Sequence, residues 1–334
     1  MLRFVVRRLF LLVPILLGLS ILIFGWIRAL PGSPAESLLG ERATPTLVQA
    51  YKQKYGFDQP VPLQYWDYLK TTVSGDLGTS IASHRSVVSE FANRFPATIE
   101  LAGSAMIFAI LLGIPLGFIA AKRYGTIFDH ASLVASLVGI STPIFFLALI
   151  LKYIFAVRLA WLPSVGRIDI LDTTKHPTNF YLLDALIQGE WGTLWDVVKH
   201  LILPAIALGS IPLAIIARIT RAAVLDVQNE DYVRTARAKG LAPVTVDERH
   251  VLRNALLPVT TVIGLQTGLL LSGAILTETV FARPGVGTWL SEAIFNRDYP
   301  VLQGGIMFVA VVFVLVNLVV DVSYAFINPR IRYS

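Results

Sequence analysis

The chain has 334 residues, of which 55% are hydrophobic and 15% charged, and its mean hydropathy is +0.66. This composition excludes a soluble globular protein, because several apolar runs reach the length of about 20 residues that spans a bilayer. The absence of cysteine excludes a disulfide framework and a Cys-based zinc or iron–sulfur site. The net charge of +6 is compatible with a nucleic-acid partner. We predict none, because the basic residues cluster at the ends of apolar blocks, as topology determinants do.

The chain begins with an apolar run that we interpret as a retained membrane span. Arg3, Arg7 and Arg8 precede the run Leu9–Leu30, and positive flanks stay on the cytoplasmic side. The run is too long for the core of an ordinary signal peptide and has no convincing small-residue cleavage site. The N-terminus is therefore predicted to be cytoplasmic, and the polar segment 31–94 that follows is predicted to be extracytoplasmic.

Five further apolar runs are long enough to cross a bilayer. They cover Thr98–Ala121, Ala131–Leu151, His200–Ile219, Pro258–Val280 and Val301–Tyr324. Pro204 and Pro212 are expected to interrupt the run that begins at His200. Alternation places a second extracytoplasmic loop at 158–199, in which Tyr181–Gln188 has the pattern of a short interfacial amphipathic helix. The sequence thus predicts an all-α polytopic membrane protein with six spans, large extracytoplasmic loops and both termini in the cytoplasm.

The stretch Asn229–Pro258 is a long polar and basic segment between two strongly apolar blocks. Its first part has the pattern of a short helix, with a capping side chain, early acids, later bases and a closing glycine. These features are supplied by Asn229, Glu230, Asp231, Arg234, Arg237, Lys239 and Gly240. Small residues at its centre, including Ala236, would let another backbone approach closely. Composition alone favours a solvated charged loop, and the rest of the chain decides between the two interpretations.

The sequence lacks several motifs that carry chemistry. It has no GxxxxGK[ST] phosphate loop, no HExxH zinc helix and no GxSxG nucleophile elbow. Its five histidines are scattered without metal-ligand spacing. We therefore predict a non-catalytic chain without a metal site, whose energy source lies in another subunit.

Polar side chains within membrane spans often mark a transport path. The candidates here are Ser141, Thr142, Gln266 and Ser272. For Gln266 we rank an interhelical hydrogen bond before a role in the path. Glu100 and Glu278 lie near predicted span ends, where we expect them at the headgroup level rather than in a pore. No chain of buried carboxylates is predicted, which argues against a proton-coupled pump.

Two glycines of the second span, Gly113 and Gly117, have GxxxG spacing. Because glycine has no side chain, this spacing permits another helix to approach closely. The motif is common in membrane helices, so it predicts a helix contact without indicating a function.

Several longer motifs occur in an order that agrees with the predicted topology. They are GDLGTS at Gly75–Ser80, DYVRTARAKGL at Asp231–Leu241, LRNALLPV at Leu252–Val259, ETVFARPGVGTWL at Glu278–Leu290, RDYPVLQGG at Arg297–Gly305 and NPRIR at Asn328–Arg332. With the six-span layout, they resemble the inner-membrane permease subunits of ATP-binding-cassette importers, whose EAA loop docks onto a cytoplasmic ATPase. His250 and Arg253 stand where the general loop has isoleucine and proline. This departure indicates the dipeptide/oligopeptide permease group, and the chain resembles its B-type subunits over nearly its whole length.

The resemblance implies the type I importer permease fold in three parts. These are an N-terminal helix and extracytoplasmic segment (1–97), a transmembrane domain (98–325) with a coupling loop at about 226–258, and a cytoplasmic tail (326–334). The implied partners are a second permease subunit of similar fold, two cytoplasmic ABC ATPase subunits and an extracytoplasmic peptide-binding protein. ATP and Mg would be used by the ATPases, with no cofactor on this chain, which would lie among the lipids of a bacterial inner membrane.

The resemblance also assigns roles within the polar stretch. The residues expected to dock the ATPase are Glu230, Asp231, Arg234, Ala236, Arg237 and Gly240. Arg234 and Arg237 would pair with acids on the ATPase, Ala236 would pack in its groove, and Gly240 would allow the turn. The external segments 31–94 and 158–199 are expected to receive the binding protein.

The substrate expected from the resemblance is a short peptide. Nickel and glutathione permeases share the same motifs and remain alternatives within the class. An ATP-independent channel or secondary carrier would require a clearer intramembrane charge relay, and a membrane enzyme would require a catalytic constellation. The sequence supports neither of these other classes.

Overall fold

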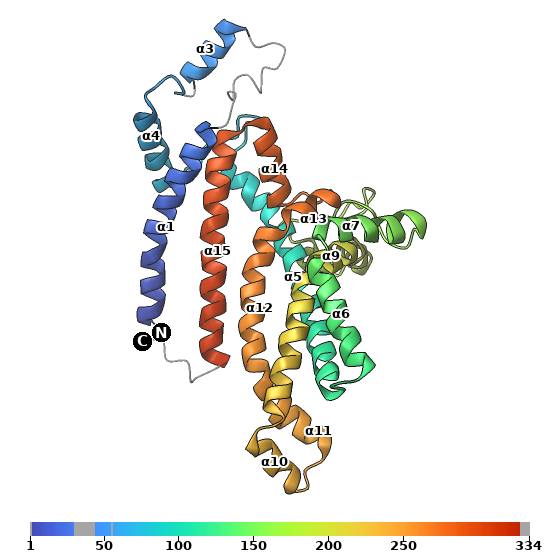
Figure 1. Ribbon diagram of the computed structural model, residues 1–334. Helices are drawn as coiled ribbons and strands as arrows, with labels where there is room; N and C mark the ends of the chain where they lie inside the picture. Colours follow the sequence, from blue (N-terminus) through green and yellow to red (C-terminus); the bar gives the residue numbers. More distant parts are fainter. Residues whose placement is uncertain (1, 30–43, 55, 328–334) are drawn as a thin grey trace. The chain divides into compact units, whose positions relative to one another are not determined.

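The computed structural model describes residues 2–29, 44–54 and 56–327, and their regular structure is helical apart from one isolated β-bridge between Thr79 and Ser86. Figure 1 shows the helices along the chain. They are α1 (Leu2–Ala29), α3 (Pro45–Lys54), α4 (Val61–Val73), α5 (Val87–Lys122), α6 (Ile127–Ser141), α7 (Ile144–Leu151), η2 (Lys152–Arg158), α8 (Tyr181–Gln188), α9 (Trp191–Val227), α10 (Asp231–Ala238), α11 (Pro243–Thr245), η3 (Val246–Leu252), α12 (Arg253–Gly273), α13 (Ile275–Val280), α14 (Val286–Asn296) and α15 (Tyr299–Ile327). The predicted tail 326–334 lies outside the described residues from position 328.

Four helices of the described chain are long and apolar enough to cross a bilayer. They are Phe10–Ala29 within α1, all of α5, all of α9, and Tyr299–Leu318 within α15. A fifth span is obtained if the bent pair Ile127–Ser141 and Ile144–Arg158 is counted as one. The prediction of an all-α membrane protein is confirmed. By length and apolar composition, the described helices account for four or five of the six predicted spans.

The run predicted as one span over Ala131–Leu151 is divided between two helices, and it is one span only if the bent pair crosses the membrane together. Helix α6 ends at Ser141, and the chain direction changes by 103° before α7 begins at Ile144. Thr142 is extended, with ψ of 123°, and Pro143 follows it. The proline ring disfavours helical backbone at the residue before it, which explains the position of the break.

The run that begins at His200 forms part of one continuous helix, although it contains two prolines. Helix α9 continues without interruption from Trp191 to Val227, through Pro204 and Pro212, which are both buried. The expected interruption is therefore wrong. A proline inside a membrane helix removes one hydrogen bond, and packing against neighbouring helices can compensate for that loss.

The described helices belong to two compact units. The first contains Met1–Pro96 and Gly285–Leu318. Its core is apolar and includes Ile27, Val87, Phe91, Trp289 and Leu302. Trp289 donates its indole N–H to Glu90 at 2.7 Å, and Ser80 donates its hydroxyl to Asp298 at 2.6 Å. These bonds hold segments that are about 200 residues apart in sequence in one piece.

The second unit contains Ala97–Pro284 and α15 from Val319. Helix α9 is its centre and contacts α6, α7, α8 and α12. Helix α5 packs closely on α9 through glycine, because a Cβ at Gly117 would lie 2.3 Å from the carbonyl oxygen of Ala217. At Gly113 the corresponding atom would lie 3.0 Å from Ile216. The helix contact predicted from the GxxxG spacing is confirmed.

Candidate functional site

The polar stretch between α9 and α12 folds as a short helix followed by a tight turn (Figure 1). Helix α10 covers Asp231–Ala238, within the first part of the stretch that was predicted to form a short helix, and Glu230 occupies its N-cap position. The side chain of Asn229 instead donates to the carbonyl of Leu225 at 2.9 Å, so the capping role predicted for Asn229 is wrong. Gly240 ends the helix with φ of +75°, a left-handed backbone that glycine adopts without strain.

One face of α10 is packed against the chain itself. Val233 is 0% exposed and Ala236 is 5% exposed. They share an apolar cluster with Ala121 of α5, Val224 of α9 and Ala255 of α12. Ala236 is therefore covered in this structure by the chain's own helices, and its expected position in a groove of a partner stays a prediction. Its small size permits α10 to approach these helices.

The other face of α10 is charged and accessible. The Asp231 and Arg234 side chains are 96% and 68% exposed and lie 3.3 Å apart at their nearest atoms. Arg237 and Lys239 are also exposed. An ion pair at this level of exposure contributes little stability. The cations of this face are therefore accessible and weakly held within the chain.

The segment is connected to the spans by polar as well as apolar contacts. Lys122, the last residue of α5, forms an ion pair with Asp247 of η3. The chain then continues from η3 directly into α12 at Arg253. Helix α10 and the segment after it therefore contact α5, α9 and α12 directly.

The candidate path residues lie on different elements. Ser141 is exposed at the end of α6, and Thr142 lies at the break, where its hydroxyl donates to the carbonyl of Val138 at 2.7 Å. Gln266 is half-buried on α12. Ser272 lies outside the residues whose side chains are described. The contacts resolved in the described part do not join Gln266 to Ser141 or Thr142, so the path assignment stays a prediction.

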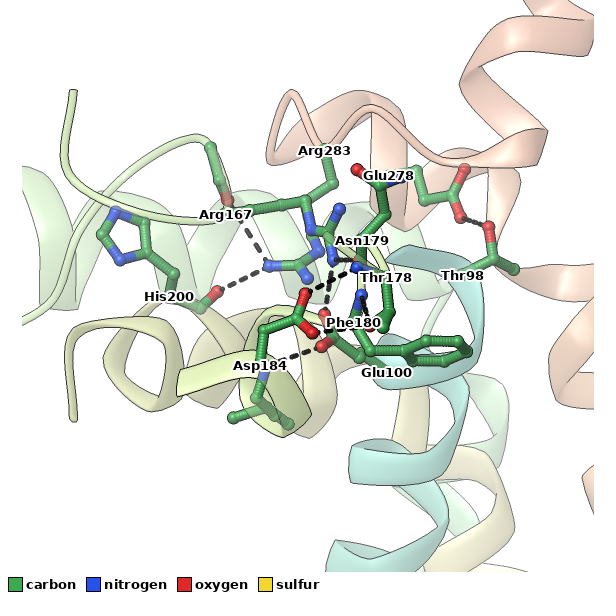
Figure 2. Close-up of polar contacts among 12 residues, drawn as sticks. Thr98, Glu100, Arg167, Thr178, Asn179, Phe180, Asp184, His200, Glu278 and Arg283 are labelled. Carbon is green, nitrogen blue, oxygen red and sulfur yellow. Dashed lines mark hydrogen bonds and ion pairs between the residues drawn. The ribbon is translucent and has the colours of Figure 1, made fainter. Parts of the chain in front are cut away.

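A buried network of charged side chains, which sequence reasoning missed, lies within the second unit (Figure 2). The side chains of Glu100 and Arg167 are each 4% exposed and form an ion pair at 2.7 Å. Glu100 also accepts the backbone N–H of Leu182 at 2.8 Å, and Arg167 donates to the carbonyl of Asn179 at 2.8 Å. The side chain of Glu100 is thus enclosed by its own fold. The headgroup-level depth expected for it stays a prediction.

Arg283 and Glu278 extend this network. Both are 0% exposed, and Arg283 donates to the carbonyls of Gly166 and His200 at 3.4 Å. Thr98 donates its hydroxyl to Glu278 at 2.6 Å. The headgroup-level depth expected for that carboxylate stays a prediction. Burial lowers the pKa of Arg283 to about 10, so its guanidinium remains charged near neutral pH. The sequence signals for this site were the arginine inside the apolar motif ETVFARPGVGTWL and the two glutamates near the predicted span ends.

The loop between η2 and α8 carries an aromatic stack on the same network. The guanidinium carbon of Arg167 lies 3.7 Å from the ring centroid of Tyr181, and the His176 ring stacks on Tyr181 at 3.8 Å. Two groups this close to one centroid must occupy opposite faces of the ring. Helix α8 coincides with the predicted Tyr181–Gln188. The stack and the ion pair fix the start of this helix.

Comparison with known proteins gives matches along the entire chain. Residues 113–333 match the family described as "Binding-protein-dependent transport system inner membrane component", and residues 1–102 match the N-terminal region of such membrane components. The chain is 51% identical over 335 residues to the di/tripeptide transport system permease protein DppB of Pseudomonas aeruginosa, covering 100% of both chains. It is 48% identical over 338 residues to the dipeptide transport system permease protein DppB of Escherichia coli K12, again with 100% of both covered.

Two further similarities concern substrate and fold. The glutathione transport system permease protein GsiC of Escherichia coli O6:H1 is 41% identical over 334 residues, with 100% of both chains covered. A solved structure of the MetNI methionine ABC transporter in inward-facing conformations matches with a TM-score of 0.52 at 15% identity, over 70% of this chain and 93% of that chain. At this identity the structural likeness supports the fold alone.

Proposed function

This chain belongs to the family of binding-protein-dependent transport system inner membrane components, and from that premise we propose that it is the membrane-spanning subunit of an ATP-driven importer of dipeptides and short oligopeptides. The observation that carries the proposal is the full-length identity of 51% and 48% to permeases named for dipeptide transport. The sequence has no phosphate loop of its own. ATP and Mg are therefore used by cytoplasmic ATPase partners in this proposal, and the chain is not itself an enzyme.

The proposed topology has six spans, with both termini in the cytoplasm of a bacterial inner membrane. Helices α1, α5, α9 and α15 supply four, the bent pair of α6 with α7–η2 supplies another, and α12 with α13 supplies the sixth. This arrangement puts α10 on the cytoplasmic side. The segments 31–94 and 158–199 are then extracytoplasmic and are proposed to receive the peptide-binding protein.

The remaining partners follow from the division of labour in such a system. A second permease subunit of similar fold would enclose the path together with this chain, and two ABC ATPase subunits would supply energy. ATP binding must bias one arrangement of the permease over another, which requires contacts that differ between the two states. Helix α10 is suited to this role because its inner face is packed against its own chain and its outer face is exposed.

We propose that Glu230, Asp231, Arg234 and Arg237 make the docking contacts, with Gly240 setting the turn. Ala236 has a supporting role, because it seats α10 on the spans. An Ala236→Trp variant would therefore disrupt the chain's own packing and would not report on docking. The informative changes are those on the exposed face.

The docking proposal is tested by reversing two exposed charges. The double variant Arg234→Glu/Arg237→Glu should lose co-purification of the ATPase subunits by tenfold or more, since charge reversal replaces attraction with repulsion across the contact. The double variant Lys70→Glu/Lys175→Glu alters net charge equally at two exposed positions outside α10 and should assemble normally. Normal ATPase assembly in the α10 variant would contradict the assignment.

The substrate is tested with the complex in proteoliposomes. Binding protein loaded with dipeptides should stimulate ATP hydrolysis and peptide uptake. Glutathione is the second candidate, because a glutathione permease is 41% identical over the full length, and stimulation by glutathione but not by dipeptides would transfer the proposal to that substrate. Uptake without ATP would contradict the importer mechanism itself.

A further inference from the structure

Helix α7 and the π-helix η2 form an apolar arm, Ile144–Arg158, that runs across the direction of α6 (Figure 1). The bend between α6 and this arm is 103°. Helix α7 has the sequence IFFLALIL, which contains no polar side chain. The large side chains on the outer side of the arm are 36–61% exposed, and they belong to Phe145, Phe146, Leu149, Ile150, Tyr153, Ile154 and Val157. The described residues of the second unit leave this side uncovered, so it requires an apolar environment from outside the chain.

Helix α9 provides a scale for the depth of the arm in the bilayer. Near its start, Trp195 is 58% exposed and the Lys199 ammonium lies 5.8 Å from the centroid of its ring. An exposed tryptophan with a cation beside it is typical of the headgroup level. Near its other end, Arg221 forms an ion pair with Asp129 at the start of α6. At the usual helical rise, Lys199 and Arg221 are about 33 Å apart, which is close to the thickness of the hydrocarbon core.

The arm contacts α9 inside this interval. Ala148 of α7 is 0% exposed and shares a buried cluster with Leu203 and Ala207 of α9. These two residues lie roughly 6 and 12 Å from Lys199 along the helix, on the side toward Arg221. The arm is therefore at the depth of the acyl chains, in the half of the bilayer that is closer to Lys199.

The length of α6 agrees with this depth. Helix α6 has 15 residues, so it is about 22 Å long and cannot cross a hydrocarbon core of about 30 Å. Near its end, a Cβ at Gly139 would lie 3.9 Å from the carbonyl oxygen of Ser210. Ser210 is still about 16 Å from Lys199 along α9. The chain thus turns at Thr142 before it reaches the headgroups.

The residues of the arm are sorted by size between its two sides. Ala148 and Ala156 face the cluster that contains Leu203 and Phe281, whereas the outer side carries aromatic and branched aliphatic side chains. Helices that pack on one another in membranes use small residues at the contact, because these let two backbones approach. The outer side lacks such residues, which favours acyl chains over a helix of a second permease as its cover.

We propose that the arm lies in the plane of the bilayer and that acyl chains of the outer leaflet cover its exposed side. This position rests on the proposed topology, in which α10 is cytoplasmic. The two cations of the arm are compatible with it. Lys152 donates to the carbonyl of Val280 at 2.8 Å, and Arg158 donates to the hydroxyl of Tyr153 at 2.7 Å while it remains exposed. Arg158 ends the arm, and its long side chain can extend to the headgroups.

The experiment measures the depth of spin labels in the complete complex, reconstituted in phospholipid vesicles. The sequence has no cysteine, so a nitroxide can be attached to one introduced cysteine at a time. Two matched sets of exposed positions cover equal lengths of chain. The set in the arm is Phe146→Cys, Ile150→Cys and Val157→Cys, and the set in α6 is Ile127→Cys, Val134→Cys and Val138→Cys.

Depth is obtained from the accessibility of each label to oxygen, which concentrates in hydrocarbon, relative to a nickel chelate, which stays in water. The labels in α6 should change in depth by about 16 Å from Ile127 to Val138. The labels in the arm should change by only about 4 Å, since the 103° bend leaves less than a quarter of that length along α6. All arm labels should be accessible to oxygen. Phe145→Cys and Leu149→Cys replace any arm variant that does not assemble, and the complex with the unmodified chain gives the background from other subunits.

Three results would overturn the proposal. A depth change along the arm equal to that along α6 would mean that the arm continues across the membrane. Low oxygen accessibility at every arm position would mean that the second permease covers it, and high accessibility to the nickel chelate would mean contact with water. The labels report depth without substrate or ATP, so peptide uptake by the same vesicles tests the proposed function separately. Loss of uptake with a flat arm would contradict that function and still support the position of the arm.

Discussion

At the scale of single residues, the buried ion pair of Glu100 and Arg167 shows how charge is accommodated inside this chain. Both side chains are 4% exposed, and each has a further hydrogen bond to backbone. Removing a charge from water is costly, and the cost is recovered only when the partner and the additional hydrogen bonds are in place. The pair is therefore sensitive to the loss of one member.

The variant Arg167→Met should destabilise the second unit by about 3–5 kcal/mol, because it leaves Glu100 buried without a compensating charge. Thermal unfolding of the purified complex measures the change. Arg158→Met removes an exposed arginine from the same unit and should have little effect. Adding Glu100→Gln to Arg167→Met should recover part of the loss, and equal melting temperatures in all variants would disprove the argument.

The histidine of the aromatic stack predicts a local pH dependence. Burial lowers the pKa of His176 below its ordinary value of 6.5, so between these two values the unfolded segment binds more protons than the folded one. The stabilisation that neutral His176 gives this segment should be fully present above about pH 6.5. It should be lost as the pH falls through the lowered pKa of the folded state. Hydrogen exchange of residues 167–184 at pH 7 and pH 5, corrected for intrinsic rates, measures this.

Two controls accompany that measurement. His176→Gln should remove the difference between the two pH values. Asp172 makes the stability of the segment depend on pH in a lower pH range, because hydrogen bonds from Thr174 and Thr193 lower the pKa of its carboxyl group. Its stabilisation is present above about pH 4 and is lost below it. Equal protection of the segment at pH 7 and pH 5 would contradict the role of His176.

At the scale of elements, the contact of α5 with α9 depends on the absence of a side chain. A Cβ at Gly117 would lie 2.3 Å from a backbone oxygen of Ala217, whereas a Cβ at Gly103 on the same helix would meet nothing within 4 Å. The two glycines therefore differ in tertiary role although they have the same local structure.

Gly117→Ala should destabilise the protein by about 1–3 kcal/mol, because the added methyl group forces the two helices apart. Gly103→Ala should be neutral or slightly stabilising, since alanine is the better helix former. Melting temperatures of the two purified variants provide the comparison. A Gly117→Ala variant as stable as Gly103→Ala would show that α5 and α9 do not pack at this distance.

The same scale shows which parts of the fold could be predicted. Helices α8 and α10 are defined by local signals, and their predicted and observed ranges agree closely. Local signals did not predict which prolines break a helix. Helix α6 ends just before Pro143, whereas α9 continues through Pro204 and Pro212. Whether a proline breaks a membrane helix depends on what packs around it, and hydropathy does not contain that information.

At the scale of the whole molecule, the proposed topology assigns opposite sides of the membrane to two accessible positions. The sequence has no cysteine, so single cysteines can be introduced without removing others. Ile170→Cys, at a position that is 95% exposed, should react with an impermeant maleimide in intact spheroplasts. Val244→Cys, at a position that is 65% exposed, should react only after the membrane is opened.

The unmodified chain serves as the control because it should not be labelled in either condition. Labelling of Val244→Cys in intact spheroplasts would place the segment with α10 outside and contradict its docking to a cytoplasmic ATPase. Labelling of Ile170→Cys only after permeabilisation would invert the proposed orientation.

The sequence by itself determined the class of the protein, the short helix between two apolar blocks, and the resemblance to importer permeases. These properties depend on composition, on neighbouring residues and on the order of motifs, all of which can be read along the chain without knowing its fold. The tertiary structure decided that Ala236 faces its own chain and that Glu100 pairs with Arg167. Such contacts join residues that are far apart in sequence, and they arise only when helices pack and exclude solvent.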